Sequence, residues 1–169
     1  MTVMTTTTEE EEVKEAPGSD ERQLVVFHLG VELYGVDIAC VHEIVRMQTI
    51  TTVPRAPAFV EGVINLRGKV IPVIDLRHRF HLAAADHTRA SRIVVVEIGD
   101  QVVGLVVDSV SEVLRITPAL IEPPSPVVAG IDSEYLHGIA RLPDRLVIVL
   151  DLHRVLAREE RRAVDVAAA

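Results

Sequence analysis

The amino-acid sequence predicts an all-β fold made of two copies of one module. Hydrophobic residues make up 49% of the chain but aromatic residues only 3%, so the core must consist mainly of valine, isoleucine and leucine. These residues occur in short runs bounded by glycine and proline, a pattern typical of small β-sheets with tight turns. An internal repeat gives the runs of the first half counterparts in the second.

The repeat includes glycine and charged residues as well as apolar ones. At an offset of 69 residues, Gly30 falls on Gly99 and Glu43 on Glu112. A second register, at an offset of 76 residues, aligns Gly62, Leu66, Val73, Asp75 and Leu76 with Gly138, Leu142, Val149, Asp151 and Leu152. The proline-rich stretch 122–126 absorbs the difference between the two registers.

Each module holds about five short strands, which favours a small closed or partly closed barrel. We expect the first barrel at about residues 22–85 and the second at about residues 92–150. Two adjacent barrels leave a groove between them, and such grooves are frequent binding sites. A short amphipathic helix is expected at residues 152–163, with Val155 and Leu156 as its apolar contacts.

Three strands are predicted at the start of the first module. Residues 24–29 and 32–36 are apolar runs separated by Gly30. Residues 41–47 alternate without a cleanly apolar face, as an edge or interface strand does. Ile44 lies between polar neighbours on its face, so it is either covered by the other barrel or open to a partner.

The most informative stretch is GVINLRGKVIPVIDLR, residues 62–77. Its second apolar run, residues 70–76, is nearly continuous and predicts a strand that is buried on both faces. A turn at residues 65–68 joins the two runs, and Gly68 supplies the positive φ that a tight turn needs. Arg67 stands on this turn, either as an ordinary solvated residue or as a binding anchor.

The repeat separates these two interpretations of Arg67. The second copy carries Pro143 in the place of Arg67, so the turn alone does not require an arginine. Glu43, in contrast, is matched by Glu112. We hypothesise that Glu43 and Arg67 meet, and that a bidentate bond holds the guanidinium in place. An exposed pair contributes little to stability, so its value would lie in positioning.

Charge and composition exclude several classes of function. Residues 1–21 carry seven acids and one base and are expected to form a disordered acidic tail, as are residues 164–169 at the other end. The remainder is nearly neutral and has few aromatic side chains, which argues against nucleic-acid binding. The single cysteine, Cys40, suits a reducing cytosol as a buried inert thiol. The sequence shows neither a secretory signal nor a membrane-spanning run.

A metal-dependent enzyme is the alternative from another class. His78, His81 and His87 lie close together in the connector 78–91 and could hold a metal, although partners at the usual spacing are missing. The sequence carries no nucleophile-elbow, zinc-protease, phosphate-loop or dinucleotide motif. The duplicated Asp75 and Asp151 fit capping or turn roles better than catalysis. We therefore expect no enzyme activity and no cofactor.

The motifs that run through residues 22–156 resemble those of the CheW-like family of bacterial chemotaxis coupling proteins. They are YGVDI at 34–38, VHEI at 41–44, PAFVEG at 57–62, NLRG at 65–68, VIPVIDLR at 70–77, VVGLVVDSVSEVL at 102–114 and EYLHG at 134–138. The resemblance implies a domain at residues 22–163, with two intertwined SH3-like barrels of five strands each. It also implies a non-enzymatic adaptor, monomeric when isolated, that joins chemoreceptors to the histidine kinase CheA.

The resemblance also implies where partners bind. The chemoreceptor's cytoplasmic hairpin tip would dock in the groove, on the residues Arg67, Glu43, Ile44, Ile38, Val36, Gly62, Asn65 and Gly68. The kinase's regulatory domain would contact the barrel ends near Val103, Leu105 and Val127. The protein would be cytoplasmic and recruited to membrane-bound arrays without inserting into the membrane. A coupling role in a non-flagellar pathway, such as twitching motility, stays open.

Overall fold

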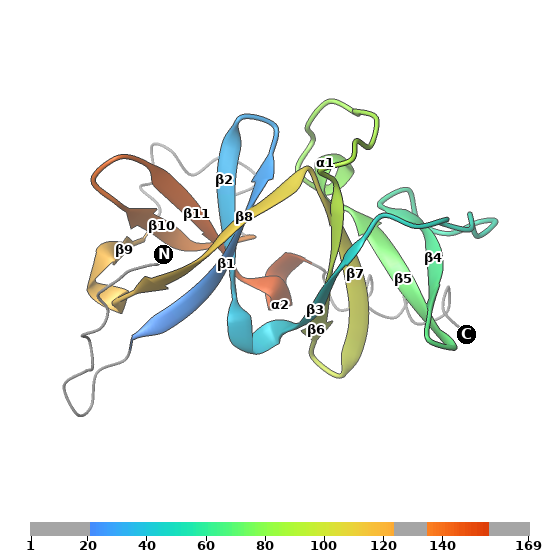
Figure 1. Cartoon of the computed structure of the whole chain (residues 1–169), viewed down its shortest axis with the longest axis horizontal. Helices are drawn as coiled ribbons and strands as arrows, with labels where there is room; N and C mark the ends of the chain where they lie inside the picture. Colours follow the sequence, from blue (N-terminus) through green and yellow to red (C-terminus); the bar gives the residue numbers. More distant parts are fainter. Residues whose placement is uncertain (1–20, 124–134, 156–169) are drawn as a thin grey trace.

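The structure is a computed structural model that describes residues 21–123 and 135–155. Its strands form two sheets that lie side by side (Figure 1). The six-stranded sheet has the order β8-β1-β2-β11-β10-β9 and the five-stranded sheet the order β3-β6-β7-β5-β4. This arrangement confirms the predicted all-β fold with two β subdomains. The predicted tails, residues 1–20 of the first and all of the second, lie outside the described residues.

The strands of the six-stranded sheet come from both halves of the chain. They are β1 (Arg22–Leu29), β2 (Glu32–Asp37), β8 (Ser109–Ile116), β9 (Ile121–Glu122), β10 (Leu136–Arg141) and β11 (Leu146–Leu150). All neighbouring pairs are antiparallel except β11 and β2, which pair in parallel at Val149 and Gly35.

The five-stranded sheet repeats this arrangement. Its strands are β3 (Val41–Arg46), β4 (Val60–Leu66), β5 (Lys69–Asp75), β6 (Arg92–Ile98) and β7 (Gln101–Val107). Here too a single pair is parallel, β5 with β7, and it joins Val73 to Gly104. Val73 and Gly104 are the repeat counterparts of Val149 and Gly35, and the two sheets match strand for strand except for β9, which has no counterpart strand in the five-stranded sheet.

The two copies exchange their first hairpins. Strands β1 and β2 of the first copy pair with β8 and β11 of the second, whereas β6 and β7 of the second pair with β3 and β5 of the first. The predicted division at residues 22–85 and 92–150 therefore differs from the observed one. One barrel holds residues 22–37, 109–122 and 136–150, and the other holds residues 41–75 and 92–107.

Alternation along the exchanged strands explains why the exchange is stable. On β1, Val25, Phe27 and Leu29 enter the largest core cluster, which takes residues from both sheets. Leu24 and Val26, which alternate with these residues and point to the other face, enter a second cluster inside the six-stranded sheet. Strand β6 divides its side chains in the same way between the shared core and a third cluster. Each exchanged hairpin therefore belongs to two cores at once, so its transfer buries both of its faces.

Close backbone packing explains two of the repeated glycines. A Cβ atom on Gly62 would lie 2.3 Å from the carbonyl oxygen of Thr51, and one on Gly138 would lie 2.6 Å from that of Glu122. In both barrels a backbone oxygen fills the space that a side chain would need. Gly62 and Gly138 are therefore required by the fold itself.

Several local predictions are confirmed. Strand β5 has four consecutive buried residues, from Ile71 to Ile74, as a strand covered on both faces should. Asp75 caps the short helix α1 (Leu76–Arg79), because its carboxylate accepts hydrogen bonds from the N–H groups of Arg77 and His78. Asp151 accepts one from the His153 N–H, at the start of α2 (Leu152–Val155). The rest of the predicted C-terminal helix, including Leu156, lies outside the described residues.

Candidate functional site

The turn between β4 and β5 presents Arg67 in a fixed conformation. Leu66 pairs with Lys69, which leaves a two-residue loop of Arg67 and Gly68 with φ angles of 52° and 88°. Positive φ at both central residues is the mark of a type I′ turn, whose twist suits a hairpin. The side chain of Asn65 strengthens the turn by accepting a 2.8 Å hydrogen bond from the Gly68 N–H. A non-glycine residue seldom adopts positive φ, so the turn holds Arg67 under mild strain.

Arg67 reaches across the barrel to Glu43 on β3. Its Nη2 donates to the Glu43 Oε2, which confirms that the two residues meet, but through this one bond and not the bidentate bond that we hypothesised. Strand β3 and the β4 end of the hairpin lie at opposite edges of the five-stranded sheet, so the pair spans the open end of the barrel. We call this end, with Glu43, Arg67 and the groove beside them, the arginine mouth.

The two charges stabilise each other's ionised form. The hydrogen bond from Arg67 is the main cause that lowers the pKa of Glu43 below its usual value. The same bond raises the pKa of the Arg67 guanidinium. The Arg67 side chain is nevertheless 69% exposed, against 31% for Glu43. The guanidinium is thus held by one partner while most of its surface faces solvent.

A groove of about 490 Å³ opens beside the pair. Apolar side chains of Ile71, Val95 and Val102 contribute to its lining, and Lys69 and Asp100 add charge. The complete lining is His42, Glu43, Leu66, Arg67, Lys69, Val70, Ile71, Pro72, Val95, Asp100, Gln101 and Val102. A groove with apolar side chains and a few fixed polar groups is suited to bind a protein segment.

Two apolar side chains lie exposed near the pair. Ile44, next to Glu43 on β3, is 39% exposed, and Val70, which follows the turn, is 53% exposed. The sequence left open whether the other barrel covers Ile44, and the structure leaves it open to solvent. His42, on the same strand, bonds to Glu97 at 3.0 Å. The arginine mouth therefore combines an oriented cation with accessible apolar surface.

The other predicted receptor-binding residues divide into accessible and inaccessible ones. Asn65 and Gly68 are exposed on the turn, and Ile38 is partly buried against the shared core. The prediction that Val36 contacts the receptor is corrected, because its side chain is fully buried in that core and offers a partner no surface. Gly62 is buried as well, and its role is the close approach to Thr51 described above.

Two of the three predicted kinase contacts are buried, so their side chains offer no surface to a partner. Val103 and Leu105 are both 0% exposed, since β7 lies in the interior of its sheet and packs into the shared core. A near-continuous apolar run such as VVGLVV is typical of a strand buried on both faces, so the sequence held this signal. Val127, the third position, lies outside the described residues.

The structure shows a second arginine–glutamate pair that the sequence comparison missed. Arg145 Nη2 donates to Glu112 Oε2 at 2.5 Å, in the barrel that lacks an arginine at the turn position. At the offset of 76 residues, Arg145 is the counterpart of Lys69 and not of Arg67. The arginine has moved two residues along the turn while its glutamate partner has stayed in place. A search for any basic residue within the turn would have found it.

The connector histidines do not gather into a site. His87 bonds to Glu61 at 3.0 Å, and the backbone N–H of His78 donates to Asp75. In the described parts of the chain, no three His, Cys, Asp or Glu side chains are arranged to hold a metal ion. The geometry therefore gives no support to the metal-dependent alternative.

Comparison with known proteins identifies relatives along most of the chain. Residues 23–160 match the model of the CheW-like domain. The chain is 38% identical over 149 residues to "Chemotaxis protein CheW" of Treponema pallidum, covering 86% of this chain and 88% of the relative. It is 31% identical over 151 residues to "Protein FrzA" of Myxococcus xanthus, covering 88% and 94%.

A solved structure is similar in fold as well as in sequence. The scaffolding protein TtCheW of Thermoanaerobacter tengcongensis superimposes with a TM-score of 0.77 at 44% identity. The match covers 89% of this chain and 96% of that one. The Treponema pallidum relative is named as a chemotaxis protein and the solved structure as a scaffolding protein, and none of the three names denotes an enzyme. Within residues 21–123 and 135–155, no helix has the length and apolar character needed to cross a membrane.

Proposed function

Because the chain belongs to the CheW-like domain family, we propose that it is a non-enzymatic adaptor that couples chemoreceptors to the histidine kinase CheA. In this role it would be cytoplasmic and recruited to membrane-bound receptor arrays. The arginine mouth is the proposed docking site for the cytoplasmic hairpin tip of the receptor. Its residues in this role are Arg67, Glu43, Ile44, Asn65 and Gly68, with Ile38 at the margin.

The observation that carries this proposal is the exposed but oriented guanidinium of Arg67. A pair this exposed adds little to the stability of the fold. Its main physical effect is to restrict the rotamers of a long side chain before a partner arrives, which lowers the entropy cost of binding. A guanidinium carries five N–H donors, so the bond to Glu43 leaves it able to donate to a second acceptor.

The surroundings of Arg67 suit a helical hairpin. Such a tip presents apolar side chains on one face and polar groups at its turn. Ile44 and Val70 offer accessible apolar surface, and the adjoining groove of about 490 Å³ offers space for side chains of the partner. An arginine near apolar surface is also a frequent centre of binding energy in protein interfaces.

The kinase partner is proposed from the family alone. With Val103 and Leu105 buried, only Val127 remains of the predicted contacts, and it is still a prediction. A coupling role in a non-flagellar pathway is the second candidate. This second candidate is supported by the similarity to "Protein FrzA", a relative that is not named for chemotaxis.

A pulldown with a chemoreceptor cytoplasmic hairpin tests the proposal. We expect the native chain to retain the hairpin and Arg67→Ala to lose most of the binding, about tenfold or more. Arg145→Ala is the matched control, because it removes the equivalent pair from the other barrel. Circular dichroism verifies that each variant is folded. Equal retention by the native chain and Arg67→Ala would argue against the arginine mouth as the receptor site.

A further inference from the structure

The chain crosses between the two sheets at two places. Strand β2 is followed by β3 in the other sheet, through the 3-10 turn η2 (Ile38–Cys40). Strand β7 is followed by β8, and a single residue, Asp108, separates them. The remaining consecutive strands named above stay within one sheet. These two crossings therefore decide how the barrels are joined.

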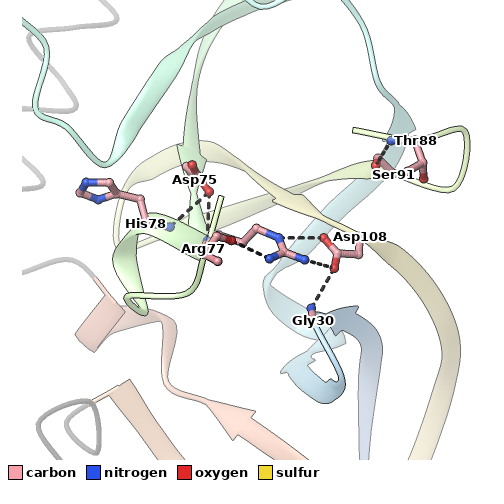
Figure 2. Close-up of polar contacts among 8 residues, drawn as sticks. Gly30, Asp75, Arg77, His78, Thr88, Ser91 and Asp108 are labelled. Carbon is pink, nitrogen blue, oxygen red and sulfur yellow. Dashed lines mark hydrogen bonds and ion pairs between the residues drawn. The ribbon is translucent and has the colours of Figure 1, made fainter. Parts of the chain in front are cut away.

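Polar contacts at the second crossing connect both barrels. Asp108 Oδ2 accepts a 2.8 Å hydrogen bond from the N–H of Gly30, at the tip of the β1–β2 hairpin of one barrel. The same carboxylate receives the Arg77 guanidinium, whose Nε and Nη2 donate at 3.2 Å and 2.6 Å. Arg77 lies on α1, directly after β5 of the other barrel. Figure 2 shows the carboxylate of Asp108 between the guanidinium and Gly30.

Arg77 is fixed on its own side as well. Its backbone N–H donates to Asp75 at 3.0 Å, in the cap of α1. Its Nη1 donates to the carbonyl oxygen of Ala83 at 2.8 Å, which ties down the connector. The Arg77 side chain is only 18% exposed, unlike the exposed Arg67. A bidentate pair that is partly shielded from water is stronger and more directional than a surface pair.

The repeat shows that these contacts are not part of the module itself. The counterpart of Asp108 is Ala39, and that of Arg77 is His153. The crossing at η2 is instead stabilised locally, because the Asp37 carboxylate accepts a 2.9 Å hydrogen bond from the Ala39 N–H. Both barrels fold with the same strand order, although only one crossing carries the ion pair. The Arg77–Asp108 pair is therefore unnecessary for forming a barrel.

We propose that Arg77 and Asp108 form a clamp that fixes the orientation of one barrel relative to the other. The clamp joins three segments, namely α1, the β7–β8 crossing and the tip of the β1–β2 hairpin. Burial alone would raise the pKa of Asp108, but the hydrogen bonds from Arg77 and the Gly30 N–H outweigh it and hold that pKa below its usual value. Asp108 is thus charged at neutral pH, as the clamp requires. A scaffold needs this rigidity when its partners contact different barrels.

Distance measurements between the barrels test the clamp in the full chain without any partner. Spin labels on Ser111→Cys and Lys69→Cys, both exposed positions, report on the two barrels in a Cys40→Ser background. The parent should give one narrow distance distribution. Arg77→Ala should broaden it about twofold and should speed amide exchange at Gly30 about tenfold.

Two conservative variants and one control complete the test. Asp108→Asn keeps an acceptor for Gly30 but loses the charge that Arg77 needs, so it should also broaden the distribution. Arg77→Lys keeps the charge but not the bidentate geometry and should give an intermediate width. Arg145→Ala breaks a pair inside one barrel and should leave the distribution narrow. Distributions as narrow as the parent's in both Arg77→Lys and Asp108→Asn would overturn the clamp, even if Arg77→Ala fails to fold.

Discussion

Each barrel end carries an arginine–glutamate pair. The two glutamates, Glu43 and Glu112, are repeat counterparts, whereas Arg67 and Arg145 stand at different positions of the repeat. In the arginine mouth, Arg67 stands at the first position of a type I′ turn and is 69% exposed. At the equivalent end of the other barrel, Arg145 is 30% exposed and contacts both Glu112 and Asp144. The repeat has thus preserved a cross-barrel ion pair while changing how much of the guanidinium faces solvent. The pair itself is a feature of the fold, and the exposure of Arg67 is what distinguishes one end.

Apolar exposure does not distinguish the two ends. Ile44 and Val70 have exposed counterparts in Val113 and Leu146, which are 51% and 58% exposed. If exposed apolar residues alone defined the docking site, both barrels would carry one. The comparison therefore assigns the specificity for the receptor to Arg67 and to neighbouring residues that differ between the copies. One of these is Gly68, whose counterpart in the second copy is Asp144.

Substitution of the packed glycines should have the largest effect, and it should be similar in both barrels. In Gly62→Ala the new methyl group would meet the backbone oxygen of Thr51, which cannot move without breaking the pairing of Thr51 with Val63. We expect a loss of about 3 kcal/mol or more in the free energy of unfolding. Gly138→Ala should cause a comparable loss, measured by denaturant unfolding. If only one of the two variants lost stability, the two glycines would not have equivalent structural roles.

Removal of the arginines should affect stability unequally. Arg145→Ala removes a partly buried side chain with two acidic partners, so we expect a loss of about 1 kcal/mol. Arg67→Ala should lower the unfolding midpoint much less than Arg145→Ala does, because its side chain is largely solvated. Parallel urea titrations of the two variants measure the difference. A larger loss for Arg67→Ala would mean that its role is structural.

The titration of Glu43 should show the smallest effect. Its folded-state pKa lies below the unfolded value because of Arg67. The pair therefore stabilises the folded state above the unfolded pKa, and this stabilisation is lost as the pH falls through the folded pKa. NMR titration of the Glu43 carboxyl should give a midpoint below the usual range of glutamate. In Arg67→Ala the midpoint should return toward that range, and an unchanged midpoint would exclude a close pair in solution.

Sequence patterns predicted the strands and the Glu43–Arg67 pair because both depend on local features. Gly68 marks the turn, and the continuous run after it marks a buried strand. Once the two modules were aligned, Arg67 stood out because Pro143 takes its place in the second copy, and Glu43 was the strand residue able to pair with it. These signals need only the spacing of residues within a copy and the comparison of the two copies.

The residue pattern could not show that the copies exchange their first hairpins, although the family resemblance implied that the barrels are intertwined. Either copy could pair its first hairpin with its own later strands or with those of the other copy, and the residue pattern is identical in both cases. The burial of Val36, Val103 and Leu105 follows from this exchange, since their strands lie in the core that the two sheets share. Arg145 was missed because the comparison required it at the position of Arg67, although a long side chain reaches Glu112 from two residues away.

Chemical-shift mapping with a chemoreceptor hairpin tests the central claim most directly. On titration of the hairpin into the isotope-labelled chain, the largest amide shifts should fall on β3 around Glu43 and Ile44 and on the turn at Arg67 and Gly68. The equivalent residues of the other barrel, around Glu112 and Arg145, should stay unshifted. Shifts centred on Glu112 and Arg145, or spread equally over both ends, would contradict the account.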